Sequence, residues 1–416
     1  MELIEGHDLT FEFSYSVAWH ETELLYSDRM SLVDRDPNHG QELKIRWLGI
    51  LNSSVLVVFL TGFVAVILFR VLKSDYTRYR RREHLKPGED DDEPDDYGWK
   101  LVHGDIFRFP QHTLLFCSLL GVGAQFLVLA LFSILLALSG IVSFYNPGGS
   151  AYTAALLLYS LTAVIAGLVS SYFFTQMEGQ KWAWCVVLTS TLFSIPFFLL
   201  GVVLNLIAAS YDSTSALSLG AIFLVVCIWL LVGFPLTLVG AIAGRHLAPP
   251  FEAPTRTNHF PRQIPEAPWY RRTAPMMVFA GFLPFSAIYI ELYFIYYSVW
   301  GHHHYSLYGL LLLVFAILVT VTSCVTISLT YFQLAMEDHQ WWWRSFLNGA
   351  STGLFIYGYS FYYYFFTSQM TGFLQASFFF VRMFLVSYIF WIMLGTVGFL
   401  ASLKFVRQIY SNIKFA

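Results

Sequence analysis

Long apolar runs separated by shorter polar segments dominate the chain from residue 48 onward. About 20 apolar residues in a helix cross a hydrocarbon core of about 30 Å, and nine runs reach that length. The pattern therefore predicts nine transmembrane helices. They lie near residues 48–69, 113–138, 153–174, 182–207, 219–243, 276–298, 307–332, 346–366 and 373–400.

The composition agrees with this pattern. Hydrophobic residues make up 56% of the chain, aromatic residues 19% and charged residues only 12%. Such a chain is too apolar for a water-soluble domain. The predicted fold class is an all-α polytopic membrane protein, with the lipid bilayer as its surroundings and no nucleic-acid partner.

Most lysine and arginine residues fall on one side of the predicted spans. If the N-terminus is outside, the inside segments hold 19 of the 24 lysines and arginines, and the loops near 139–152, 208–218, 299–306 and 367–372 hold none. Cytoplasmic loops retain positive charge. We therefore predict a luminal N-terminus and a cytosolic C-terminus.

Residues 1–46 follow a different pattern. In LTFEFSYSVAW (9–19) apolar and polar side chains alternate, as in a strand with one buried face. A lone strand cannot bury that face, so we interpret 1–46 as the remnant of a luminal β domain that precedes a nine-helix domain at 47–416. Met1 leads into polar sequence rather than a signal peptide. Either an upstream portion is absent, or the first span acts as the insertion signal.

Two cytosolic loops are expected, at 70–112 and 244–275. The first begins with a basic block, TRYRRREH, which either follows the positive-inside pattern or attracts anionic lipid. Its acidic run, EDDDEPDD, is typical of a solvated linker. The second loop is rich in proline, which forbids a regular helix, so it is either an ordered connector at the membrane face or a docking peptide.

The residues that usually carry metal, redox or catalytic chemistry form no such pattern here. The four cysteines fall within spans and lack C-x-x-C spacing. His302, His303 and His304 are consecutive, so their side chains point in different directions, and we predict no metal site. Trp341, Trp342 and Trp343 are interpreted as an interfacial belt. Nucleotide-binding and hydrolase motifs are missing, so neither an enzyme nor a cofactor is predicted.

Three spans contain proline, at Pro196, Pro235 and Pro284. A proline inside a helix frees a backbone carbonyl and usually kinks the axis. Three adjacent breaks indicate either a cavity or a mobile bundle, or else static kinks that improve packing.

Glu291 and Arg382 are the two charged residues well inside predicted spans. A charge at the centre of a bilayer costs on the order of 3 kcal/mol or more, so each needs compensation. Glu291 lies nine residues before Trp300, near which its span ends, and Arg382 lies nine residues after Phe373, where its span begins, so each is about 13 Å deep at 1.5 Å per residue. We predict that they face each other or share a polar cavity with Tyr289 and Gln125. The alternatives are a protonated Glu291 bonded to a neighbouring helix and an Arg382 that extends outward.

Several long motifs resemble one family of membrane proteins, the nonaspanins or transmembrane-nine superfamily. They are RVLKSDYTRY, DDYGWKLVHGDIFRFP, GVGAQF, WLLVGFPLT, FEAPTRTNHFPRQIPEAPWY, GFLPFSAIYIELYF, WGHHHYSLYG, TYFQLAMEDHQWWWRS, STGLFIY and MLGTVGFLASLKFVRQIY. Together they extend from about residue 44 to 411. Glu291 falls in the span-six motif, whereas Arg382 belongs to no motif of the family.

The resemblance implies a protein of Golgi and endosomal membranes, without enzymatic activity, that assists the sorting and surface delivery of other membrane proteins, or adhesion and phagocytosis. It also implies a C-terminal Lys-x-Asp/Glu signal for coat proteins. Lys414 has the required position, but Ala416 replaces the acid, so we expect only a weak coat-binding site.

The leading hypothesis is a noncatalytic sorting protein that recognises the transmembrane segments of client proteins. Gly121 and Gly123 would allow close helix contacts with a client, or would pack the protein's own bundle. The alternative is a transporter or channel that uses the kinked helices and Glu291. A continuous polar path past Glu291 favours transport, and a groove open to lipid favours partner binding.

Overall fold

The computed structural model describes residues 15–19, 39–84, 98–139, 150–214, 216–266, 268–301, 307–368 and 370–411. The chain divides into two units, Met1–Ile45 and Arg46–Ala416. In the first unit, residues 15–19 have no regular structure, and Tyr15, Val17 and Trp19 are exposed. Residues 15–19 thus do not show a strand with a buried face, which would need partner strands. The luminal β remnant stays a prediction.

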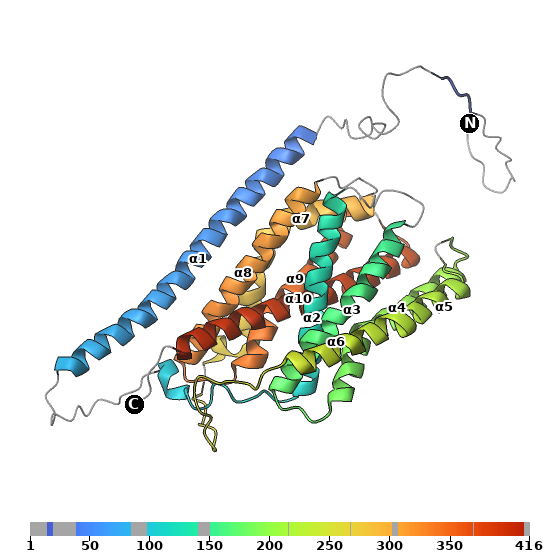
Figure 1. Cartoon of the computed structure of the whole chain (residues 1–416). Helices are drawn as coiled ribbons and strands as arrows, with labels where there is room; N and C mark the ends of the chain where they lie inside the picture. Colours follow the sequence, from blue (N-terminus) through green and yellow to red (C-terminus); the bar gives the residue numbers. More distant parts are fainter. Residues whose placement is uncertain are drawn as a thin grey trace. The chain divides into compact units, whose positions relative to one another are not determined.

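Every regular element of the described residues is helical (Figure 1). The long helices are α1 (His39–His84), α2 (Thr113–Leu138), α3 (Ser150–Gln176), α4 (Trp182–Ser210), α5 (Leu219–Ile228), α6 (Phe234–Leu247), α7 (Thr273–Gly301), α8 (Tyr308–Ala335), α9 (Trp341–Tyr362) and α10 (Phe373–Ser411). Four short helices, η2 (Gly98–Val102), η3 (Trp229–Gly233), η4 (Trp269–Arg271) and η5 (Tyr363–Thr367), complete the set.

Eight helical segments of the described residues are long and apolar enough to cross a membrane. They coincide with eight of the nine predicted spans, and η3 joins α5 to α6 in one of them. The all-helical membrane fold is thus confirmed. The remaining predicted span, 346–366, corresponds to α9 and η5, which are not among these eight segments. The buried residues of α9 include the polar Ser345, Asn348, Ser351, Thr352 and Ser360. A ninth crossing and the orientation of the chain therefore stay predictions.

Helix α9 packs against α7, α8 and α10. Its residues Phe346 and Ile356 are fully buried, as is Phe399 of α10. Close approach of these helices depends on small residues. A Cβ added at Gly349 would run into the carbonyl oxygen of Leu394 on α10.

Glycines also bring α3 and α6 into backbone contact. Gly167, Gly240 and Gly244 each face a carbonyl oxygen of the opposite helix, at a distance that leaves no room for a Cβ atom. Gly121 and Gly123 of α2 have the same role, against Ala166 of α3 and Thr396 of α10. Of the two roles left open for these α2 glycines, the structure thus supports packing of the protein's own bundle.

The proline-rich loop is an ordered connector that packs on residues 98–111. The backbone N–H of Asn258 donates to the carbonyl of Gly104 at 2.8 Å. Asp105, which is buried, accepts hydrogen bonds from the Arg108 guanidinium at 2.9 Å and from the backbone N–H of Arg262 at 3.1 Å. These bonds offset the cost of burying the carboxylate. The two loops therefore form one layer.

The interpretation of the three tryptophans as an interfacial belt is wrong for Trp341 and Trp342, which are 0% and 3% exposed. The loop layer covers them. The Trp341 ring lies parallel to Phe399 with 5.9 Å between centroids, and its Nε1–H donates to the carbonyl of Ile106 at 2.9 Å. A buried indole N–H requires such a partner, so Trp341 joins the loop layer to the bundle.

Replacing Trp341 by phenylalanine is expected to destabilise the protein by about 1–3 kcal/mol, because the Ile106 carbonyl loses its buried donor while most of the stacking remains. The melting temperature of the purified chain in detergent measures this effect. Trp269, which is 74% exposed, provides the control. A Trp341→Phe variant as stable as Trp269→Phe would contradict the assigned role.

The predicted breaks at proline are not observed as interruptions. Helices α4 and α7 continue through Pro196 and Pro284. Pro235 follows the π-helical turn η3, in which the N–H of Phe234 donates to the carbonyl of Trp229, five residues back. A π turn is one of the ways in which a helix accommodates a local irregularity. These three spans are therefore continuous.

Candidate functional site on α7 and α9

Glu291 of α7 forms an ion pair with Arg46 of α1. The distance from Arg46 Nη1 to Glu291 Oε1 is 3.8 Å, and the residues are 9% and 4% exposed, respectively. The Arg46 guanidinium also lies over the Phe294 ring, 3.9 Å from its centroid. Because the pair is removed from solvent, its charges are screened little and each depends strongly on the other.

The neighbouring residues of α1 explain how Arg46 reaches Glu291. Gly49 and Ser53 follow Arg46 at intervals of three and four residues, so all three share one helix face. Ser53 Oγ donates to the carbonyl of Ala287 at 2.6 Å, and Gly49 lies against Ile290. Sequence reasoning missed Arg46 because the apolar run begins two residues later. The sequence feature that could have identified Arg46 was its spacing from Gly49 and Ser53, which places all three on one helix face.

The predicted pairing of Glu291 with Arg382 is not what the structure contains. The Arg382 side chain is exposed, and its guanidinium lies 6.0 Å from the centroid of Trp300 and 5.0 Å from that of Phe378. Trp300 is nine residues beyond Glu291 on α7, about 13 Å along a helix. The long side chain thus extends toward the helix end, which matches the alternative of an outward-directed arginine.

The predicted cavity shared by Glu291, Tyr289 and Gln125 is also corrected. Gln125 Nε2 donates to the carbonyl of Tyr159 at 3.0 Å, so it joins α2 to α3. Tyr289 and Glu291 are two residues apart, about 200° around a helix, and they face opposite sides of α7. Within the described part of the chain, these candidates therefore do not line one polar path.

Tyr289 instead lines a cavity of about 730 Å³ between α7 and α9, which we call the α7–α9 groove. Its lining is apolar and aromatic apart from Ser351 and three tyrosine hydroxyls. The lining residues are Ala274, Met277, Val278, Phe285, Tyr289, Ser351, Leu354, Phe355, Gly358, Tyr359 and Tyr362. Val278 and Leu354 are both 57% exposed, so the rim of the groove is open to the surroundings.

Two features of α9 give the groove its chemistry. Gly358 has no heavy atom within 4 Å of the position that a Cβ would take, so the backbone there is accessible. The Tyr359 hydroxyl is buried and has no hydrogen-bond partner among the described residues. Its ring packs edge-on against Tyr289, with centroids 5.4 Å apart. The groove therefore combines an accessible backbone position at Gly358 with a buried hydroxyl at Tyr359 that the described residues leave unpartnered.

Next to Tyr359, further aromatic side chains join α7 to α9 and its continuation η5. Tyr296 of α7 contacts the rings of Tyr359 and Tyr363, with centroids 5.3 and 5.2 Å apart. The Tyr296 and Ser360 hydroxyls lie 2.8 Å apart and form a hydrogen bond. These contacts fix α7 against α9, so the groove has a rigid wall.

Several residues singled out in the sequence lie away from the groove. His302, His303, His304 and Lys414 fall outside the described residues. In the part of the chain that is described, no group of three His, Cys, Asp or Glu side chains is arranged to hold a metal ion. Cys117, Cys185, Cys227 and Cys324 are free thiols.

Comparison with known proteins places the chain in a family. The family model described as Endomembrane protein 70 matches residues 2–373. Transmembrane 9 superfamily member 4 of Arabidopsis thaliana is 50% identical over 417 residues, which cover 100% of this chain and 69% of that protein. Member 1 of Mus musculus is 49% identical over 403 residues, covering 96% of this chain and 66% of that protein.

A further relative, from Dictyostelium discoideum, carries a name that describes it as a candidate phagocytic receptor. It is 50% identical over 415 residues, which cover 100% of this chain and 70% of that protein. None of these names indicates a catalytic activity. No solved structure matches the chain. The resemblance seen in the motifs is confirmed, and the chain belongs to the Endomembrane protein 70 family of transmembrane 9 superfamily membrane proteins.

Proposed function

We propose that this chain is a noncatalytic protein of Golgi and endosomal membranes that assists the sorting, trafficking or surface localisation of other membrane proteins. In this proposal the α7–α9 groove holds a transmembrane helix of the client. The observation that carries it is an apolar groove, about 730 Å³ in volume, that opens between α9 and α7, the latter a helix apolar enough to cross a membrane.

The lining of the groove suits a helix that arrives from the bilayer. Lipid tails are as apolar as leucine, so association between membrane helices depends on close packing and hydrogen bonds rather than on hydrophobic burial. Gly358 leaves space for the backbone of a second helix. Ser351, seven residues earlier on the same face of α9, is buried against Gly281 of α7, so Gly358 is the accessible small residue of the lining.

The Tyr359 hydroxyl supplies selectivity in this proposal. A buried hydroxyl without a partner carries an energetic cost, which a polar group on the client would relieve. The preferred client would thus have a small-residue face with one polar side chain. A purely apolar helix would bind less tightly.

The dispersed polar residues do not favour the alternative of a transporter. Glu291 is paired with Arg46, and Gln125 is bonded to the backbone of α3. The C-terminal Lys414, with Ala416 in place of the acid, is retained in the proposal as a weak contact for coat proteins.

Filling the groove is expected to reduce client binding. In a Gly358→Leu variant the new side chain enters open space, so the protein folds while the α9 surface is blocked. We expect at least a tenfold lower recovery of co-purifying multi-pass and single-pass membrane proteins, measured by quantitative mass spectrometry after mild detergent extraction.

Gly201→Leu is the matched control. Gly201 of α4 also has open space around the position of a Cβ, and it lies outside the groove. Equal recovery of membrane proteins with the Gly358→Leu and Gly201→Leu variants would exclude the groove as the binding surface.

A further inference from the structure

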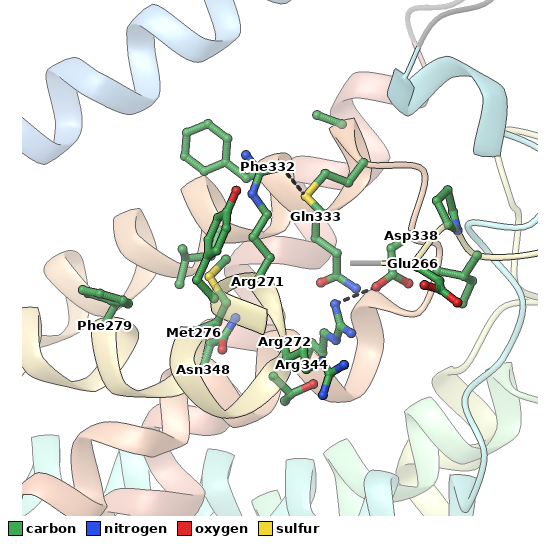
Figure 2. Close-up of a pocket in the computed structure, with 17 residues that line it drawn as sticks. Glu266, Arg271, Arg272, Met276, Phe279, Phe332, Gln333, Asp338, Arg344 and Asn348 are labelled. Carbon is green, nitrogen blue, oxygen red and sulfur yellow. Dashed lines mark hydrogen bonds and ion pairs between the residues drawn. The ribbon is translucent and has the colours of Figure 1, made fainter. Parts of the chain in front are cut away.

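A second cavity, of about 1010 Å³, lies where the proline-rich loop meets the beginnings of α7 and α9 and the end of α8 (Figure 2). We call it the arginine pocket. Arg271 and Arg272 precede α7, and Arg344 belongs to the first turn of α9. Three arginines thus line one cavity, where α7 and α9 begin and α8 ends.

The charges of the arginine pocket leave an excess of positive charge. Arg344 Nη1 forms an ion pair with Asp338 Oδ2 at 2.6 Å, and Glu266 is the other acid in the lining. Arg271 Nη1 lies 2.8 Å from the sulfur of Met336, which is a weak, uncharged acceptor. Three cations against two carboxylates give a pocket that favours an anion.

Two buried amides point to a ligand independently of this charge. Gln333 and Asn348 line the pocket and are 7% and 4% exposed. Gln333 Nε2 and Asn348 Oδ1 have no hydrogen-bond partner among the described residues. Figure 2 shows the Gln333 side chain beside the ion pair of Asp338 and Arg344. Because unpartnered buried amides are costly, this part of the pocket is suited to a polar ligand.

The opposite wall of the pocket is apolar. It contains Met276 and Phe279 of α7 and Phe332 of α8, and the two phenylalanines are 64% and 44% exposed. These residues belong to segments that are apolar enough to span a membrane. A ligand that fits both walls would have a polar, anionic end and an apolar end.

We propose that the arginine pocket binds the phosphate-bearing headgroup of an anionic membrane lipid. Arg271 and Arg272 contact the phosphate, and guanidinium groups suit phosphate oxygens because they donate paired hydrogen bonds. Gln333 and Asn348 bond to the ester or hydroxyl groups beside the phosphate. One acyl chain lies along Phe279 and Phe332.

The test uses the full chain in detergent with three probes: dioctanoyl phosphatidic acid, dioctanoyl phosphatidylcholine and inorganic phosphate. We expect saturable binding of phosphatidic acid by calorimetry, with binding of the other two at least tenfold weaker. Equal binding of the two lipids would overturn the anionic selectivity. Inorganic phosphate that binds as tightly as phosphatidic acid would show a site for the free anion and contradict the lipid assignment.

The residue assignment is tested with an Arg271→Gln/Arg272→Gln variant, which we expect to lose at least tenfold in affinity for phosphatidic acid. Arg245→Gln/Arg256→Gln removes the same charge outside the pocket and is expected to bind normally. Gln333→Met keeps the side-chain volume but removes one or two hydrogen bonds to the ligand. We expect its affinity for phosphatidic acid to fall roughly five- to tenfold. The site is refuted if Arg271→Gln/Arg272→Gln and Gln333→Met both bind phosphatidic acid as tightly as the control variant and the native chain. An unchanged melting temperature without lipid verifies that each variant folds.

Discussion

Arg46→Leu is expected to lower the free energy of unfolding by about 3–5 kcal/mol, because it removes the Arg46 cation that pairs with the buried Glu291 carboxylate. The Arg46–Glu291 pair lies between α1 and α7, where both residues are less than a tenth exposed. Unfolding in detergent, followed by thermal melting or chemical denaturation, measures the change. Arg382→Leu removes an exposed arginine and is expected to cost less than about 1 kcal/mol.

The double variant Arg46→Leu/Glu291→Leu separates the pair from its surroundings. Replacing a buried ion pair by apolar residues of similar volume is often neutral or stabilising, so much of the stability lost in Arg46→Leu should return. If the effects of the two single substitutions simply add in the double variant, the residues do not interact energetically, and the contact would be incidental.

Gly167→Ala is the second substitution with a large expected effect. The added methyl group would run into the carbonyl oxygen of Thr237, which is backbone and cannot rotate away. Helices α3 and α6 would have to separate along the contact that Gly240 and Gly244 also maintain. Overpacking typically costs about 1–3 kcal/mol and sometimes more, and here we expect the upper part of that range or loss of folded protein.

Gly201→Ala provides the control for this substitution, because the position of its Cβ is in open space on α4. Alanine is a better helix former than glycine by about 1 kcal/mol, so Gly201→Ala should be neutral or slightly stabilising. Size-exclusion profiles and melting temperatures of both variants give the comparison. Equal stability would mean that α3 and α6 do not meet at Gly167.

The apolar pattern predicted the helices well, because a membrane span needs an uninterrupted run of fixed minimum length. The span at 113–138 has the bounds of α2 itself. Helix α1 was less well predicted: it runs from His39 to His84, whereas the apolar run ends at residue 69. Helical structure does not stop where lipid-compatible residues stop, and the basic residues beyond the span are good helix formers.

Residue partners were harder to predict, because they depend on which helix faces meet. Depth along the span suggested Arg382 as the partner of Glu291, yet α1 brings Arg46 to the same carboxylate. Trp341 illustrates the same limit. A tryptophan cluster beside an arginine is typical of an interface, but the loop layer covers it and gives its N–H a partner at Ile106.

The groove had only a weak signal in the sequence. Ser351 and Gly358 repeat at a spacing of seven residues on α9, and aromatic side chains lie around them. Small residues serve both internal packing and partner binding, and the structure separates the two uses. Gly349 and Gly353 pack against α10, whereas Gly358 is accessible.

Site-specific photo-crosslinking from the groove tests the proposed function most directly. A photoreactive amino acid at Leu354, on the exposed rim of the groove, is compared with one at Leu199 of α4, which is 64% exposed. We expect crosslinks from Leu354 that map to transmembrane segments of other membrane proteins, disappear with Gly358→Leu and do not form from Leu199. Crosslinks to lipid alone, or to the same proteins from both positions, would contradict it.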